Sequence, residues 1–455
     1  MIQIFKKGLS FIGIDKAIIF TIIERVLQAG SGIVTLLVVA KCLTKVEQGY
    51  YYTFGSILAI QIFFELGLSN IIIQFVAHEN ALLKWQDGVK FEGDNEAASR
   101  LSSLLRFSVK WFAILSIILF VGLVLAGYSF FYRFGKSGHL VNWQSPWIIL
   151  SFTTSLSLML SPILAFIEGL GRIKEIAKIR AIQQIVQITL VFAFFMSGFK
   201  LYSSPLAAIF AFSIIPTWIL FTHRKKMLLF IWNKIDVFKV NYRKEIFPYQ
   251  WKIALSWISG YFIFQLFNPV LFATEGPIIA GQMGMTIAVL NAILMFSLSW
   301  ISTKVPIFSS LIATKDYAAL DSLFKKTFWQ SVFLNLLALS VFFSLIFCLR
   351  YFDIRFGNKQ FADRFLPLIP MFFMIVPIFL NHMVASWATY LRCHKKEPLL
   401  IQSLIMGILC STSTFVLGNH FGVFGMTLGY MVLTMIGAGW VFIIFNNKKT
   451  EWHNE

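Results

Sequence analysis

The chain has 455 residues, of which 58% are hydrophobic and only 13% are charged, with 39 Lys and Arg residues against 21 Asp and Glu residues. Soluble proteins carry about 25% charged residues, so this composition excludes a soluble globular protein and a disordered one. At roughly 20 apolar residues for each bilayer crossing, about a dozen crossings leave little room for a soluble enzyme domain. We therefore predict an all-α integral membrane protein.

Long apolar runs separated by charged or turn-forming segments predict twelve transmembrane helices. A basic and aromatic segment at 223–252 divides them into two sets of six. We expect an N-terminal lobe at 1–222, a cytoplasmic amphipathic linker at 223–252 and a C-terminal lobe at 253–455. The twelve spans lie near 17–40, 51–75, 111–131, 146–169, 176–198, 201–222, 254–274, 278–303, 328–349, 366–391, 399–417 and 421–445.

The two halves resemble each other weakly. Ser103–Phe107, before the third span, corresponds to Ser322–Lys326, before the ninth. Leu170–Glu175 and Leu391–Glu397 occupy equivalent connections later in each half. Because each half contains six spans, both have the same orientation, which predicts a parallel repeat.

The distribution of Lys and Arg predicts the orientation. With a cytoplasmic N-terminus, the inner segments hold 29 of the 39 basic residues and the outer loops hold 9, which leaves Arg25 within a span. This is the pattern of the positive-inside rule, so we expect both termini in the cytoplasm. Membrane topology therefore accounts for the net charge of +18, and nucleic acid is not an expected partner.

Motifs for catalysis, cofactor binding or metal binding are absent from the sequence, and its four cysteines form no close pair. We expect neither catalytic residues nor a bound metal or cofactor, and we expect a protein that is not an enzyme. A membrane glycosyltransferase or polymerase would need substantial outer loops, whereas the predicted outer loops are short.

Charged side chains within the spans are the first candidates for function, because an unpaired ion in the bilayer costs at least about 2.5–3.5 kcal/mol. Arg25 in the first span and Glu65 in the second are predicted at matching depths, which suggests an ion pair. Glu24 points about 100° away from Arg25 on the same helix. The pair could lock two helices, or Arg25 could line a polar cavity that receives an anionic head group.

Polar side chains elsewhere in the spans, most of them uncharged, predict a polar interior shared by both lobes. Each of them alone could instead form an interhelical hydrogen bond. Basic residues at two inner connections form a predicted cytoplasmic entrance: Arg172, Lys174, Arg392, Lys395 and Lys396. The candidate cavity residues, besides Arg25, Glu24 and Glu65, are Arg180, Gln183, Gln187, Asn268, Gln282, Asn291, Asn381 and His382.

Several segments resemble the Wzx-like flippases of O-antigen and other polysaccharides, in the polysaccharide transporter branch of the MATE/MOP exporter superfamily. They are Glu47–Ser56, Phe64–Leu68, Gly281–Thr286 and the glycines Gly422, Gly425 and Gly429. The resemblance implies two six-helix lobes that flip an undecaprenyl-pyrophosphate-linked oligosaccharide across the bacterial cytoplasmic membrane by alternating access, for surface polysaccharide such as lipopolysaccharide. Its implied partners are the lipid-linked substrate, membrane lipids and polysaccharide assembly proteins.

A second hypothesis is a cation-coupled exporter of small molecules or drugs from the same superfamily. In that protein Glu24, Glu65 or Glu275 would bind the coupling H⁺ or Na⁺. The two hypotheses differ in the cavity that they require: a pyrophosphate favours Arg and Lys, whereas a cationic drug favours Glu and Asp.

Overall fold

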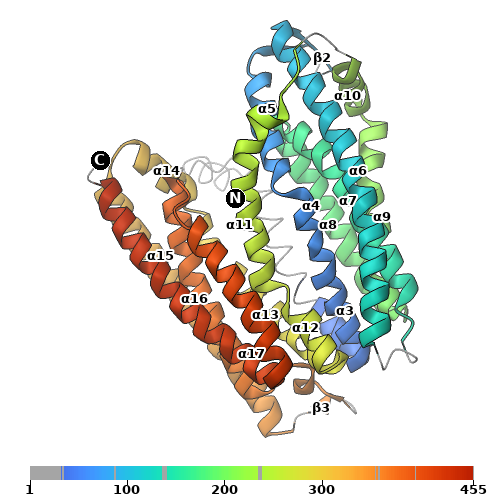
Figure 1. The fold of residues 1–455 in the computed structure, drawn as a ribbon, viewed down its shortest axis with the longest axis vertical. Coiled ribbons are helices and arrows are strands. Elements are labelled where there is room, and N and C mark those ends of the chain that lie inside the picture. Colours follow the sequence, from blue (N-terminus) through green and yellow to red (C-terminus); the bar gives the residue numbers. More distant parts are fainter. Residues whose placement is uncertain are drawn as a thin grey trace, which may run out of the picture. The chain divides into compact units, whose positions relative to one another are not determined.

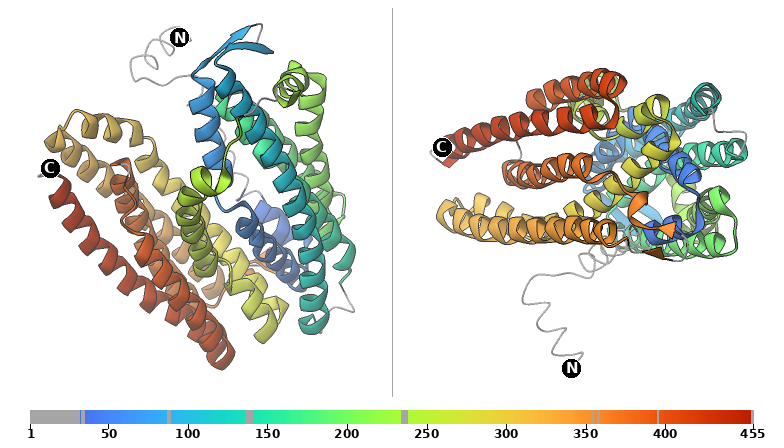
Figure 2. Two further views of the ribbon diagram at one scale, coloured as in Figure 1. Left: turned by 45° about the horizontal axis from the view of Figure 1, so that its top comes forward. Right: turned by 90° about the horizontal axis from the view of Figure 1, so that it is seen from below.

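The computed structural model describes residues 32, 35–86, 89–135, 141–233, 238–353, 355–356, 359–394 and 396–453. The chain forms two compact helical units (Figures 1 and 2). Of the described residues, the first unit contains 60–131 and 142–257, and the second contains 32–59, 258–453 and the short connection around 132–141. Residues 35–59 therefore pack with the C-terminal half of the chain, although they precede most of the first unit in sequence.

The first unit is built mainly from long helices. The second predicted span is interrupted: Leu66 and Gly67 both have left-handed backbone conformations, with φ of 47° and 70°. Leu66 stores strain there, because a residue with a Cβ rarely adopts positive φ. The helices are α4 (Ile62–Glu65), α5 (Leu68–Asn80), α6 (Asn95–Phe134), α7 (Gln144–Gly169), α8 (Ile173–Met196) and α9 (Ser203–Phe221), with short 3₁₀ turns η1 (Ala59–Gln61) and η3 (Lys200–Tyr202).

The predicted linker folds against the first unit. It contains α10 (His223–Asn233) and a π-helical turn, η4 (Tyr242–Ile246), that leads into α11 (Phe247–Phe264). Ser99 on α6 donates a hydrogen bond of 2.7 Å to the carbonyl of Phe238. Arg100 bridges Glu79 and Glu245 at 2.8 and 2.5 Å. An antiparallel hairpin of β1 (Leu83–Gln86) and β2 (Lys90–Gly93) lies between α5 and α6 in sequence, with Leu83 opposite Gly93.

The first labelled helix of the second unit is α3 (Lys45–Leu58), where Thr44 and Glu47 form a reciprocal capping box. Its C-terminal helices α15, α16 and α17 lie side by side (Figure 2). The other elements are α12 (Phe267–Thr274), α13 (Pro277–Ser302), α14 (Val305–Ala313), α15 (Tyr317–Tyr351), the hairpin β3 (Arg355–Phe356) and β4 (Lys359–Gln360), the 3₁₀ turn η5 (Ala362–Arg364), α16 (Leu368–Cys393) and α17 (Leu400–His453).

Close approach of α3 to α13 depends on small residues. An added Cβ at Gly49 would overlap the backbone of Pro277, and one at Gly281 would lie 2.8 Å from the amide nitrogen of Gly49. Within lipid, small residues let helix backbones approach closely and gain van der Waals contact. The sequence segments around Gly49 and Gly281, which carry the family resemblance, are therefore one packing interface.

Ten helices in the described part of the chain are long and apolar enough to cross a membrane. They account for the second to the twelfth predicted spans, because α17 contains both the eleventh and the twelfth; the first, 17–40, lies largely outside the described residues. The all-α, multi-pass membrane fold class that the sequence predicted is confirmed.

Helix α17 reverses direction at Gly422, whose φ of 58° and ψ of −145° are not helical. After this turn the chain returns along itself, so that Gly429 faces Ser413 and Gly437 faces Met406. The carboxylate of Glu275 accepts a hydrogen bond from the amide of Val423, the first residue of the returning arm. Glu275, an ion-binding candidate in the sequence, therefore caps a helix in this structure.

Candidate functional site

A cavity of about 360 Å³ lies within the first unit, between α5, α7, α8 and α9. Its wall is mixed, with carboxylates, a guanidinium, amides, hydroxyls and apolar groups. The lining residues are Glu65, Ser69, Asn70, Ile73, Ser157, Leu160, Ser161, Leu164, Ala165, Glu168, Arg180, Gln183, Phe212 and Ile215. Three residues predicted from sequence, Glu65, Arg180 and Gln183, therefore meet in one cavity.

Local backbone features place these groups. Glu65 is the last residue of α4, and the left-handed break that follows starts α5 in a new direction, with Ser69 and Asn70 in its first turn. Pro162 interrupts the hydrogen-bond ladder of α7, because proline has no amide proton to donate to the carbonyl of Leu158. The hydroxyl of Ser161 donates to that carbonyl instead, at 2.9 Å.

The serine hydroxyls of α7 therefore offer mainly acceptors to the cavity. Ser157 donates its proton to the carbonyl of Thr153 at 2.8 Å, as Ser161 does to Leu158. A hydroxyl has one proton and two lone pairs, so each serine oxygen retains capacity to accept. A ligand in this cavity is expected to donate hydrogen bonds to these oxygens.

An ion pair contributes to the lining of the cavity. Arg180 on α8 approaches the carboxylate of Glu168, in the last turn of α7, at 3.3 Å. Glu168 is about four-fifths buried and Arg180 is 41% exposed. The sequence analysis did not select Glu168; the available signal was a carboxylate within the last turn of an apolar span. Of the lining residues described here, two carboxylates accompany one guanidinium.

The remaining candidates in the first unit do not line this cavity. Gln187 lies one helical turn beyond Gln183 on α8 and is half-buried. At the predicted entrance, Arg172 lies 3.8 Å from Glu175, which also pairs with Arg224 at 2.7 Å. Lys174 is exposed. Glu24 and Arg25 lie outside the described residues, so the predicted Arg25–Glu65 pair stays a prediction.

The candidates in the second unit are dispersed rather than gathered at one site. Asn268 donates to the hydroxyl of Ser56 at 3.0 Å, which joins α12 to α3. Asn381 donates to the hydroxyl of Tyr430 at 3.0 Å. Asn291 is exposed on α13. These contacts match the interhelical hydrogen bonds that the sequence allowed as an alternative role.

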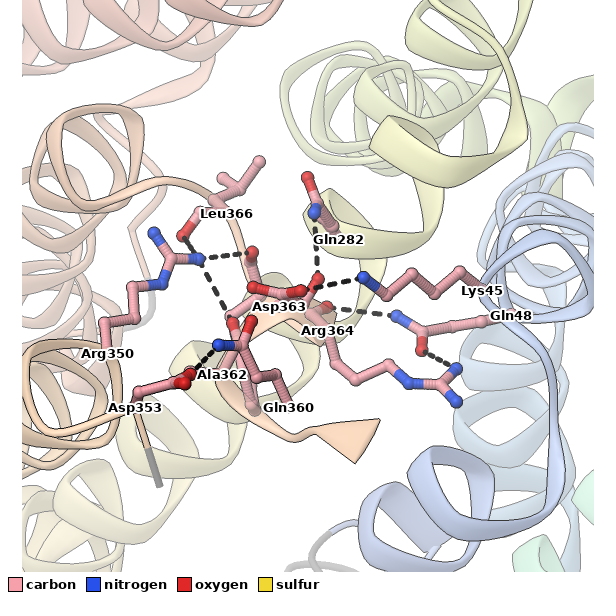
Figure 3. A network of polar contacts seen from close by, with 11 residues as sticks. Lys45, Gln48, Gln282, Arg350, Asp353, Gln360, Ala362, Asp363, Arg364 and Leu366 are labelled. Carbon is pink, nitrogen blue, oxygen red and sulfur yellow. Dashed lines mark hydrogen bonds and ion pairs between the residues drawn. The ribbon is translucent and has the colours of Figure 1, made fainter. Parts of the chain in front are cut away.

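Gln282 belongs to a polar network that holds η5 against α3 and α13 (Figure 3). It donates to the carbonyl of Asp363 at 2.9 Å. Figure 3 shows Arg364 and Gln48 facing one another; Arg364 donates to the Gln48 side-chain oxygen at 3.0 Å and to the carbonyl of Leu43 at 2.7 Å. Burial lowers the pKa of Arg364 despite the nearby charge of Glu47. Gln282 therefore links α13 to η5 in this structure.

His382 is fully buried between α13, α15 and α16. Its Nε2 lies 2.6 Å from the hydroxyl of Ser331, and that hydroxyl donates its proton to the carbonyl of Ser297 at 2.7 Å. Ser331 has only this one proton, so Nε2 must carry the imidazole proton and donate to Ser331. Asn335 donates to the hydroxyl of Ser297 at 3.2 Å. His382 thus joins three helices.

The predicted entrance cations of the second unit are engaged by neighbours. Arg392 forms a two-point contact with Glu397, at 2.8 and 3.1 Å. Lys396 lies 4.8 Å from the ring centre of Trp452. Lys395 lies outside the described residues. The described residues of this connection therefore do not present a row of unpaired cations.

No family model matches the chain, and no curated protein matches it. Solved structures do match. The chain is similar to the inward-facing conformation of a multidrug resistance MATE family transporter of the MOP superfamily, with a TM-score of 0.68 and 13% identity over 97% of this chain and 99% of that one.

Two further structures have the same fold. Lipid II flippase MurJ is matched with a TM-score of 0.55 and 14% identity over 93% of this chain and 86% of that one. A MOP superfamily transporter from Pyrococcus furiosus is matched with a TM-score of 0.56 and 14% identity over 95% and 94%. The chain therefore has the multi-pass, all-α fold found in MATE transporters and in MurJ.

Proposed function

We propose that this protein is a flippase that moves a lipid-linked oligosaccharide across the bacterial cytoplasmic membrane by alternating access. The carrying observation is the cavity of the first unit, where hydroxyls, amides, carboxylates and a guanidinium surround about 360 Å³. That volume falls near the lower end of ligand pockets, roughly 300–1,000 Å³. The fold is shared with a protein named as a lipid II flippase.

The lining suits the sugar part of such a substrate. Sugar hydroxyls donate and accept hydrogen bonds, and the cavity offers serine oxygens, Glu65 and Glu168 as acceptors and Gln183 and Asn70 as groups that do both. Phe212 adds an aromatic surface on which the apolar face of a sugar ring can rest. We infer that the oligosaccharide enters this cavity.

The pyrophosphate requires a different location. Two carboxylates against one guanidinium give the described lining a negative balance, which repels a pyrophosphate rather than attracting it. We place the polyprenyl-pyrophosphate part outside this cavity, with Arg25 as the candidate cation in the first predicted span. The undecaprenyl carrier, the cytoplasmic location of both termini and the polysaccharide assembly partners belong to this proposal.

The same negative balance supports a second candidate function. A cation-coupled exporter of small molecules needs carboxylates to hold a cationic drug, H⁺ or Na⁺, and Glu65 and Glu168 lie in the cavity. The solved structures that share the fold include multidrug transporters by their names. Glu275 is the weaker ion-binding candidate because its carboxylate caps the returning arm of α17.

Deletion of the gene in cells that need it for surface polysaccharide tests the first proposal. We expect undecaprenyl-linked repeat units to accumulate on the inner leaflet, and wild-type protein to relieve the accumulation. Glu168→Gln and Arg25→Ala should relieve it poorly, provided that both variants reach the membrane at wild-type levels. Asn291→Ala is the matched control, because Asn291 is exposed and lies outside the cavity lining.

Normal surface polysaccharide without accumulation would reject the flippase. Efflux of ethidium from cells with and without an imposed pH or Na⁺ gradient then tests the exporter. Gradient-dependent efflux that is lost in Glu65→Gln would support that function.

A further inference from the structure

An exposed face at one end of α15 carries two lysines and two aromatic side chains. Ser322, Lys325, Lys326, Trp329, Gln330 and Phe333 line an open groove of about 620 Å³. Their spacing of three and four residues puts them on one side of the helix. Trp329 is 57% exposed and Phe333 is 67% exposed. Cationic and aromatic groups therefore lie next to each other along the helix axis.

The repeat-related face of the first unit is covered. Ser103 and Arg106 on α6 correspond in sequence to Ser322 and Lys325 on α15. Arg106 donates through Nε to the carbonyl of Trp232 at 2.9 Å, and its guanidinium lies 5.4 Å from the centre of the Trp232 ring. The linker thus supplies this cation with an oxygen acceptor and an aromatic surface.

The covering continues along α6. The amide of Val240 donates to the hydroxyl of Ser103 at 3.3 Å, and the ring of Tyr242 lies 5.2 Å from that of Phe107. Ser103, Arg106 and Phe107 are consequently half-buried, whereas Ser322, Lys325 and Lys326 are exposed. In the first unit, this helix face therefore binds an oxygen acceptor at its cation and an aromatic group beside it. We expect the corresponding face of α15 to bind groups of the same kind.

No described residue neutralises the lysines of α15 in an equivalent way. In the described part of the chain, neither Lys325 nor Lys326 has a hydrogen bond or an ion pair. The carboxylate of Asp321, one turn away, is already engaged by Lys449 at 2.7 Å and by the hydroxyl of Tyr390 at 2.8 Å. Two adjacent positive charges therefore face outward without an anion from the described residues.

We propose that this face binds the head group of an anionic phospholipid. The two lysines hold the phosphate oxygens, the hydroxyl of Ser322 donates to the same head group, and Trp329 lies at the interface, where tryptophan is favoured. An acyl chain runs along Phe333, Leu336 and Leu337, all at least 49% exposed. By the orientation that the sequence predicts, this lipid belongs to the cytoplasmic leaflet.

A lipid fits this face better than a polypeptide. The exposed surface passes from the lysines, by way of Trp329 and Gln330, to apolar side chains of a membrane-spanning helix. A phospholipid combines an anionic head group with a hydrocarbon chain in the same order. Lysine near an anionic membrane surface gains electrostatic attraction from each charge.

The first test counts bound lipids by native mass spectrometry of the purified full chain in detergent, with phosphatidylglycerol and phosphatidylcholine as probes. We expect one tightly retained phosphatidylglycerol in wild type, with affinity about thirtyfold lower in Lys325→Gln/Lys326→Gln. Lys325→Arg/Lys326→Arg should keep the binding. Inorganic phosphate and glycerol 3-phosphate should compete poorly, because they lack acyl chains.

The matched control removes two adjacent exposed lysines of α10, in Lys225→Gln/Lys226→Gln. Equal loss of phosphatidylglycerol in both double variants would assign the effect to general surface charge and overturn the site. Wild-type binding in the α15 variant would overturn it as well. All variants must elute as a single species on size exclusion.

A photo-reactive benzoylphenylalanine in place of Trp329 identifies the occupant in cells. A phospholipid adduct supports the proposal, whereas a protein adduct on this face overturns it. Both measurements report lipid contact and not transport, so a failure here is distinguishable from a failure of the proposed flippase function.

Discussion

Arg364 donates a hydrogen bond of 3.0 Å to the side-chain oxygen of Gln48, a residue 316 positions earlier in the chain. Both side chains are almost completely buried. Gln48 returns a hydrogen bond of 3.1 Å to the carbonyl of Arg364 and another of 2.8 Å to that of Gly281. One glutamine therefore fastens α3 to η5 and α13 within the second unit (Figure 3).

Gln48→Ala should lower the free energy of unfolding by about 1–3 kcal/mol, because it leaves the buried Arg364 guanidinium without one of its acceptors. Thermal unfolding of the purified protein in detergent measures the effect. Lys45→Ala is the control: its ion pair with Asp363 is exposed at both ends, and such pairs contribute about 0–1 kcal/mol. Equal losses from both substitutions would contradict the role given to Gln48.

Gly49→Ala should destabilise the second unit, because its Cβ would overlap the backbone of Pro277 at the α3–α13 contact. We expect a loss of about 1–3 kcal/mol, as for other overpacked sites. Gly55→Ala, on the same helix with open space around it, should instead stabilise by about 0.5–1 kcal/mol. Membrane expression levels and thermal unfolding check both substitutions; a stabilising Gly49→Ala would refute the close contact.

Arg180→Gln should reduce transport by about tenfold or more if the guanidinium contacts substrate, since loss of a charge-assisted hydrogen bond costs about 1.5–3 kcal/mol. The Glu168→Arg/Arg180→Glu exchange separates contact from structure. A purely structural pair would recover activity after the exchange, whereas a substrate contact would not. The readout is relief of accumulated lipid-linked intermediate, normalised to protein in the membrane.

The linker should loosen at acidic pH. Burial favours the neutral form of Glu245, but hydrogen bonds from Arg100 and from the amide of Asn241 outweigh it and hold the Glu245 pKa below its ordinary value of 4.5. A lowered folded-state pKa means that this stabilisation is complete above pH 4.5 and is lost as pH falls through the folded-state pKa.

Limited proteolysis between pH 3 and pH 6 measures the effect, with cleavage within 223–246 expected to rise at the acidic end. Glu245→Gln should raise cleavage at neutral pH and flatten its dependence on pH. Glu92→Gln is the control, because Glu92 lies exposed on β2. A variant that keeps the wild-type pH profile would show that another group controls the linker.

The sequence identified polar residues within the spans, but it could not tell which of them line the cavity and which link helices. Glu65, Arg180 and Gln183 could be selected because polar groups are rare in apolar spans, and the structure puts them around one cavity. Gln282 and Asn268 were selected by the same criterion, and in this structure their side chains donate hydrogen bonds to η5 and to α3. Cavity-lining residues and residues that link helices are of the same types and lie at similar depths in the spans. Only the neighbouring helix distinguishes the two roles.

The sequence by itself determined the all-α membrane class and the positions of the described spans, because each bilayer crossing requires about 20 apolar residues whatever lies beside it. The tertiary structure decided which elements meet: α3 packs with α12 and α13, Glu168 joins the cavity, and the linker covers part of α6. The reason is physical. Lipid is as apolar as the helix surfaces, so hydrophobicity sets which segments enter the membrane, whereas small residues and a few hydrogen bonds choose which helices meet.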